Sequence, residues 1–174
     1  MRIRNGTSSR VTGVYLTAII LLGAALRLYN LGTESFWFDE IITVHRVSQD
    51  LHPLVHQLAT QGNVTRNAVY YLLAHFWVLP FEITEVSIRS LSALFGVLSI
   101  GMMYVVGQQL FGEKVGLLSS FLMAVSEFQI QHSQEARFYS LIFNTVTIVT
   151  GFPIIFFSYY ILHFLMKYRF FNTL

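Results

Sequence analysis

Long apolar runs recur along this chain, separated by short polar stretches. They extend from Val11 to Leu31, from Ile88 to Leu110, from Val115 to Ile130 with its flanks, and from Leu141 to Met166. Because an α-helix rises about 1.5 Å per residue, about 20 apolar residues are enough to cross the hydrocarbon core of a bilayer. The pattern therefore predicts an all-α bundle of about four membrane-spanning helices, of which the third is the shortest.

The region between the first two runs, Gly32 to Ser87, has a different pattern. From Asp39 to Leu58 apolar residues recur at helical spacing and are interrupted near Pro53, which predicts an amphipathic surface helix. Ala68 to Phe81 is apolar and rich in Tyr and Trp, but its 14 residues are short for a span and typical of an interfacial helix. We interpret residues 32–87 as an outer loop with juxtamembrane helices, and residues 1–174 as a single membrane domain.

The composition agrees with membrane insertion. Hydrophobic residues make up 54% of the 174 residues, aromatic residues 16% and charged residues 11%. The net charge of +2 is too small to indicate nucleic-acid binding, and the lack of cysteine excludes disulfides and thiolate metal sites. A cleavable signal peptide is an alternative for the first run, although that run exceeds the usual ~7–15 apolar residues of such signals.

Charge predicts the orientation of the bundle, since Lys and Arg in short loops stay on the cytoplasmic side. With the amino terminus inside, the inner segments hold Arg2, Arg4, Arg10, Lys114, Lys167 and Arg169. Eight of the nine acidic residues, all except Glu113, then lie outside. We therefore expect an integral plasma-membrane protein with a cytoplasmic amino terminus, in which residues 32–87 and 126–140 face outward.

Two features within the spans concern packing. Ser92 and Gly96 form a small-xxx-small pair that lets two helices approach closely. Pro153 removes a backbone donor within the fourth run, so a kink is expected there.

Adjacent carboxylates follow the first run at Asp39 and Glu40. A carboxylate at the mouth of a membrane cavity can accept a proton, coordinate a divalent cation, or remain a solvated loop charge. The aromatic residues Phe36, Trp37 and Phe38 would hold the pair near the headgroup level. The pair is therefore a candidate catalytic site and a candidate site for a divalent cation.

A second polar cluster extends from Gln131 to Tyr139 and contains Glu135 and Arg137. Charges at the edge of a span are costly unless they are paired or used, and an interfacial ion pair or snorkelling side chains would also explain them. His52 and His56 have the i, i+4 spacing of a helical zinc pair, but Pro53 between them weakens that interpretation. The spacing of the remaining histidines indicates no metal site.

Six blocks along the chain form a further pattern. They are Leu26-Arg27-Leu28 with Leu31-Gly32, Phe36–Glu40, Tyr70–Trp77, Arg89–Gly96, Gln109–Gly112 and Ser133–Ser140. In this order they resemble the amino-terminal part of family 39-like membrane glycosyltransferases of the GT-C fold group. That group includes protein O-mannosyltransferases and the aminoarabinose and lipopolysaccharide-core transferases.

The resemblance implies transfer of a sugar from a polyprenyl-phosphate donor to a lipid, glycan or protein acceptor on the outer face. It assigns the catalytic base to Asp39, with Glu40 as its neighbour and Glu135 as the second acid of the cavity. We expect Arg137, with Arg89, to stabilise the departing phosphate, because a guanidinium matches the geometry of phosphate oxygens.

The chain departs from that family in two respects. Thr65 to Val69 stands where many members carry His-Pro-Pro, and full members are several hundred residues long. We therefore expect an amino-terminal module that is incomplete alone, with a carboxy-terminal half as a partner.

Two other classes of protein are alternatives. One is a small multispan membrane protein or assembly subunit without chemistry of its own. The other is a transporter or channel fragment, which would require charged or broken helices at mid-membrane. Geometry discriminates between the classes, because an enzyme-derived module should bring Asp39, Glu135 and Arg137 to one outward cavity.

Overall fold

The computed structural model describes residues 6–61, 67–148 and 151. All regular secondary structure in these ranges is helical, as the sequence predicts. The elements are α1 (Gly6–Leu28), α2 (Phe38–Val47), α3 (Leu51–Thr60), α5 (Ala68–Val78), α6 (Glu85–Phe111), α7 (Glu113–Val125) and α8 (Glu127–Gln134), followed by a helix at Tyr139–Ile148.

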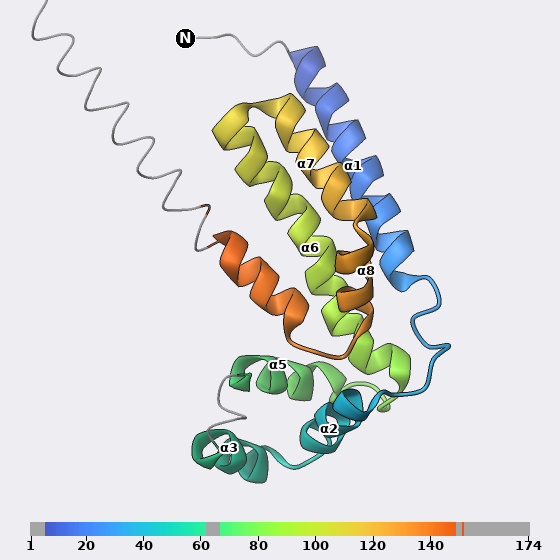
Figure 1. The fold of residues 1–174 in the computed structure, drawn as a ribbon, viewed down its shortest axis with the longest axis vertical. Coiled ribbons are helices and arrows are strands. Elements are labelled where there is room, and N and C mark those ends of the chain that lie inside the picture. Colours follow the sequence, from blue (N-terminus) through green and yellow to red (C-terminus); the bar gives the residue numbers. More distant parts are fainter. Residues whose placement is uncertain (1–5, 62–66, 149–150, 152–174) are drawn as a thin grey trace, which may run out of the picture.

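The helices form an elongated bundle with a cluster of short helices at one end (Figure 1). The long helix α6 packs against α1, α7 and α8, while α5 packs against both α2 and α6. Figure 1 shows α2, α3 and α5 together at one end, with the α6–α7 turn and the start of α1 at the other. The residues between α1 and α6 and those after α8 therefore meet at the same end of the bundle.

Two described helical segments, Arg10–Leu28 and Glu85–Phe111, are long and apolar enough to span a membrane. They correspond to the first and second predicted spans. Of the fourth predicted span, the structure describes the apolar helix Tyr139–Ile148, and Pro153 lies outside the described residues. The all-helical fold is confirmed. Among the described residues, only the first two predicted spans correspond to helices that are long and apolar enough to cross a membrane.

The third predicted span is not one helix. Its helix ends at Val125, Ser126 adopts an extended conformation, and α8 begins at Glu127. A tertiary contact accompanies the break, since the fully buried Arg27 of α1 donates hydrogen bonds to the carbonyls of Met123 and Ala124 at the end of α7. These terminal carbonyls have no partner within their own helix.

The amphipathic segment between Asp39 and Leu58 is also divided, but not where the sequence predicted. The interruption falls between Val47 and Leu51, and Pro53 is the third residue of α3. Proline is tolerated there because an N–H in the first turn has no intrahelical acceptor. The predicted break near Pro53 is therefore wrong by a few residues.

The short helix α5 connects α2 to the long helix α6 through hydrogen bonds. His75 Nδ1 lies 2.9 Å from the carbonyl oxygen of Val47 in α2, and Trp77 Nε1 donates to Ser90 Oγ in α6 at 2.9 Å. An apolar core surrounds these contacts and includes Val47, Leu54, Leu58, Tyr70, Ala74, Val78, Ile88, Leu91 and Ala136. The short helices are thus held in a fixed position beside the start of α6.

Gly96 allows α8 to lie against α6, and its replacement provides a test of that packing. A Cβ atom at Gly96 would lie 2.7 Å from Ser133 Cβ and 2.8 Å from Arg27 Nε, whereas one at Gly101 meets nothing within 4 Å. We expect Gly96→Ala to destabilise the chain by about 1–3 kcal/mol through overpacking, and Gly101→Ala to be neutral or slightly stabilising. Thermal unfolding of both variants in detergent measures the difference, and equal midpoints would contradict the close approach.

Candidate functional site

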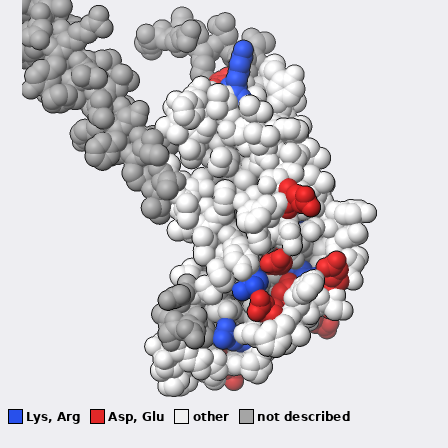
Figure 2. Space-filling model, viewed as in Figure 1, with Lys and Arg blue, Asp and Glu red and all other residues white. Residues whose placement is uncertain are grey.

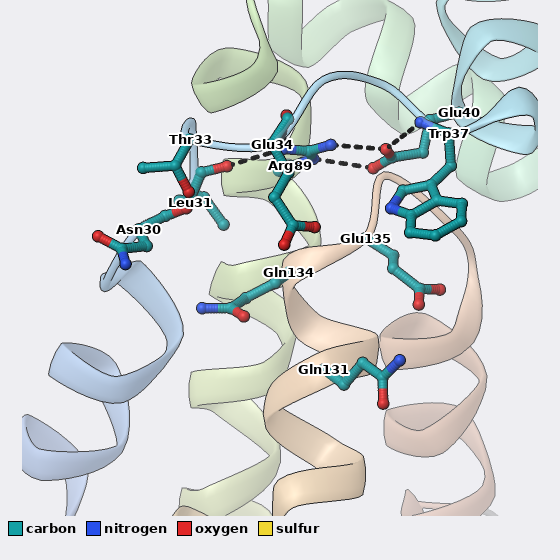
Figure 3. Close-up of a pocket in the computed structure, with 10 residues that line it drawn as sticks. All are labelled: Asn30, Leu31, Thr33, Glu34, Trp37, Glu40, Arg89, Gln131, Gln134 and Glu135. Atoms are coloured by element: carbon teal, nitrogen blue, oxygen red, sulfur yellow. Dashed lines mark hydrogen bonds and ion pairs between the residues drawn. The ribbon is translucent and has the colours of Figure 1, made fainter.

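Glu40 is a buried carboxylate at the point where α2, α6 and the segment after α8 meet. Only 1% of its side chain is exposed. It accepts hydrogen bonds from Arg89 Nε at 2.9 Å, Arg89 Nη2 at 2.7 Å and the Trp37 N–H at 3.1 Å (Figure 3). It also accepts a hydrogen bond from the Ala136 N–H at 2.8 Å. Each oxygen receives two donors, which fills the acceptor capacity of the carboxylate.

Arg89 uses its remaining donors to hold the loop between α1 and α2. Nη1 donates to the carbonyls of Leu31 and Glu34, and Nη2 also donates to the carbonyl of Ser35. Together with the two bonds to Glu40, these contacts occupy all five N–H groups of the guanidinium. Arg89 therefore has no free N–H for a donor phosphate, which corrects the role expected for it from the sequence.

The environment of Glu40 stabilises its charged form. Burial alone would raise its pKa, but the hydrogen bonds from Arg89, Ala136 and Trp37 outweigh burial and hold the pKa of Glu40 below its usual range. Glu40 is therefore ionised at neutral pH and forms a buried ion pair with Arg89.

Asp39, the neighbour of Glu40 on α2, lies in a more open environment. Its side chain is 53% exposed, and its Oδ2 accepts a hydrogen bond from Arg137 Nη1 at 2.6 Å. The Arg137 guanidinium also lies 4.8 Å from the centre of the Tyr139 ring. The two adjacent carboxylates thus have different surroundings, one buried and fully bonded and the other accessible.

Every residue from Ser133 to Arg137 has a contact that helps place the segment. Ser133 is buried against Gly96, and the Gln134 side-chain amide donates to the carbonyl of Tyr29 at the end of α1, at 2.8 Å. Glu135 Oε2 lies 3.5 Å from His132 Nδ1, the Ala136 N–H binds Glu40, and Arg137 binds Asp39. The sequence predicted Glu135 and Arg137 as site residues, and the three residues around them fix their position.

These segments line two neighbouring polar cavities. The smaller, of about 140 Å³, is lined by Trp37, Asp39, Glu40, Glu135 and Arg137. The larger, of about 380 Å³, shares Trp37, Glu40 and Glu135 with it and adds Asn30, Leu31, Thr33, Glu34, Arg89, Gln131 and Gln134. Figure 3 shows its walls coming from the segment after α1, from α6 and from α8. All five predicted site residues therefore lie at one place, although Arg89 and Glu40 are bonded to each other there.

A third pocket, of about 160 Å³, lies against the same Asp39–Arg137 pair and contains a residue that the sequence analysis missed. Its walls include Asp39, Arg46, Tyr70, Tyr71 and Arg137. Arg46 follows Asp39 by seven residues, which is two helical turns and places both on one face of α2. That spacing was available in the sequence and could have identified Arg46.

The geometry limits where a cation could bind. Within residues 6–61, 67–148 and 151, no three potential ligands among His, Asp and Glu come together. Since Glu40 has its acceptor capacity filled, Asp39 and Glu40 do not form the joint cation site considered from the sequence. Asp39 and Glu135 are the carboxylates of the smaller cavity that retain exposure.

The chain matches no protein-family model, and comparisons with curated proteins and with solved structures return no significant match. The geometry of the site and the sequence blocks described above are therefore what bears on its function.

The Glu40–Arg89 pair can be tested by removing one charge. Glu40→Gln leaves Arg89 buried without a counter-charge, and we expect it to destabilise the chain by about 3–5 kcal/mol. Glu34→Gln is the matched control, because Glu34 is an exposed acid of the same site and its replacement should change stability by less than about 0.5 kcal/mol. Denaturant unfolding measures both variants, and equal midpoints would contradict a stabilising role for the buried pair.

The low pKa of Glu40 predicts a pH dependence of stability. Because the pKa is lower in the folded state than in the unfolded state, Glu40 contributes its full stabilisation above the unfolded value of about 4.3. That contribution is lost as the pH falls further and the carboxylate becomes protonated. Thermal unfolding should therefore show a smaller difference between the native chain and Glu40→Gln at pH ~3 than at pH ~7. A constant difference would contradict the lowered pKa.

Proposed function

We propose that this chain is the amino-terminal module of a GT-C membrane glycosyltransferase similar to family 39. Such an enzyme transfers a sugar from a polyprenyl-phosphate donor to a lipid, glycan or protein acceptor. The observation that supports the proposal is the direct pairing of Asp39 with Arg137, 98 residues apart, at a cavity also lined by Glu135. An assembly subunit without chemistry has no need for this convergence.

The proposed reaction assigns a proton acceptor to Asp39. Its accessible carboxylate takes the proton of the acceptor nucleophile, which forms a bond to the anomeric carbon of the sugar. The bond between that carbon and the phosphate oxygen breaks, its electron pair leaves with the lipid phosphate, and the configuration at the carbon inverts. Arg137 lies beside Asp39 and can stabilise the negative charge that develops on the phosphate.

Glu40 and Arg89 act as positioning residues in this proposal. Their buried pair fixes the first turn of α2, which carries Asp39, against the segment that carries Arg137. Glu135 and the exposed ring of Trp37 line the cavity beside Asp39 and are available to contact the sugar or the acceptor.

We further propose that the chain is an integral plasma-membrane protein of about four spans, with its amino terminus in the cytoplasm and residues 32–87 on the outer face. Figure 2 shows most charged side chains of the visible face in the half of the molecule that carries α2, α3 and α5. The start of α7, which carries Lys114, lies at the opposite end, where cytoplasmic positive charge is expected. The proposed partners are the lipid-linked donor, the acceptor and a carboxy-terminal half.

Replacement of Asp39 tests the proposed chemistry. Membranes that contain the chain, alone or with the proposed carboxy-terminal half, are supplied with radiolabelled polyprenyl-phosphate sugars. We expect Asp39→Asn to reduce transfer by about 10²-fold or more, the typical contribution of a general base. Asp50→Asn is the matched control, because Asp50 is an exposed acid that precedes α3 and does not line the cavities around Asp39.

Two outcomes would count against the proposal. Unchanged transfer by Asp39→Asn would overturn the role of Asp39 as the base. If the native chain transfers no sugar in either preparation, the assembly-subunit alternative becomes the better interpretation.

A further inference from the structure

The pocket that contains Arg46 lies against the Asp39–Arg137 ion pair but shares neither Trp37 nor Glu135 with the cavities described above. Helix α2 supplies Asp39, Thr43 and Arg46, helix α5 supplies Tyr70 and Tyr71, and Arg137 comes from the segment after α8. The pocket is small, about 160 Å³, and its walls come from three parts of the chain.

The pocket with Arg46 and the larger cavity have net charges of opposite sign. The pocket with Arg46 holds two arginines and one aspartate, which gives a net charge of +1. The larger cavity holds Glu34, Glu40 and Glu135 with one arginine, Arg89, which gives a net charge of −2. An anionic group is therefore favoured in the pocket with Arg46 and disfavoured in the larger cavity.

Arg46 is held in place at this pocket. Its Nη1 donates to the Tyr71 hydroxyl at 2.8 Å, and its guanidinium carbon lies 5.0 Å from the centre of the Tyr71 ring. The remaining N–H groups of Arg46 have no hydrogen-bond partner among the described residues, and neither do Nε and Nη2 of Arg137. A guanidinium with free N–H groups in fixed geometry is suited to bind phosphate oxygens.

We infer that Arg46 and Arg137 form a binding site for the phosphate of a polyprenyl-phosphate lipid in this pocket, with Tyr71 as the positioning residue for Arg46. The inference rests on the proposed function for the identity of the lipid. Arg46 then has the phosphate-binding role that was expected for Arg89, whose N–H groups are all occupied. The phosphate lies beside Asp39 and Arg137, where its bond to the sugar must break.

A binding experiment tests this site without requiring transfer. The purified full chain in zwitterionic detergent is titrated with a polyprenyl phosphate, and bound lipid is counted by native mass spectrometry. Polyprenol, phosphatidylglycerol and inorganic phosphate are titrated in parallel to distinguish the prenyl chain, a general anionic lipid and a free anion. We expect the polyprenyl phosphate to bind more tightly than all three.

Arg46→Gln should weaken binding of the polyprenyl phosphate by about 10-fold or more and leave binding of polyprenol unchanged. Arg10→Gln is the matched control, because Arg10 lies on α1 at the opposite end of the bundle. Tyr71→Phe removes only the hydroxyl that holds Arg46 and should produce a smaller loss of affinity. It provides a second test if Arg46→Gln does not fold.

Several results would overturn the inference: full affinity in both Arg46→Gln and Tyr71→Phe, equal affinity for polyprenol, or equal affinity for phosphatidylglycerol or inorganic phosphate. The failures of the two proposals are distinguishable. If Asp39→Asn abolishes transfer while Arg46→Gln binds normally, the proposed function stands and the phosphate site does not. If Arg46 is needed for binding but no sugar is transferred, the phosphate site stands without the enzyme activity.

Discussion

The buried ion pair between Glu40 and Arg89 is the interaction on which the arrangement of the site depends. Glu40 joins α2 to α6 and to the backbone of Ala136, while Arg89 also binds the loop that connects α1 to α2. A buried charge is tolerated only when it is paired and its hydrogen-bonding capacity is satisfied, and both conditions are met here. The pair therefore fixes three distant segments in one geometry rather than adding a surface contact.

A second constraint sets the position of Arg137. Arg27 binds the final carbonyls of α7 and so accompanies the break at Ser126, after which α8 turns and packs against Gly96. Gln134 then binds the end of α1. Because the end of α7 and the last residue of α8 both bind α1, the segment that follows α8 reaches Glu40 and Asp39 in a defined register.

The sequence predicted the helical class and the first two apolar helices from hydrophobic periodicity, and loop charge placed Asp39 and Arg137 on the same side of the membrane. Their placement in one cavity was an expectation from the family resemblance. The sequence did not predict the break at Ser126, since the contacts from Arg27 that accompany it are tertiary. Nor could the sequence predict that Glu40 is buried while Asp39 is exposed. Adjacent helical residues point about 100° apart, so one of them can be buried, but only the three-dimensional partners decide which.

The two ion pairs differ in how much they are expected to contribute to folding, because one is buried and the other is partly exposed. The Asp39–Arg137 pair is partly exposed, and such pairs typically contribute 0–1 kcal/mol to folding. The contact between Asp39 and Arg137, at 2.6 Å, is therefore expected to contribute little to stability. Glu40 and Arg89 already connect the same segments through buried bonds that the fold requires. The accessible pair therefore adds little to the connection between these segments, and in the proposed function it acts on a bound molecule.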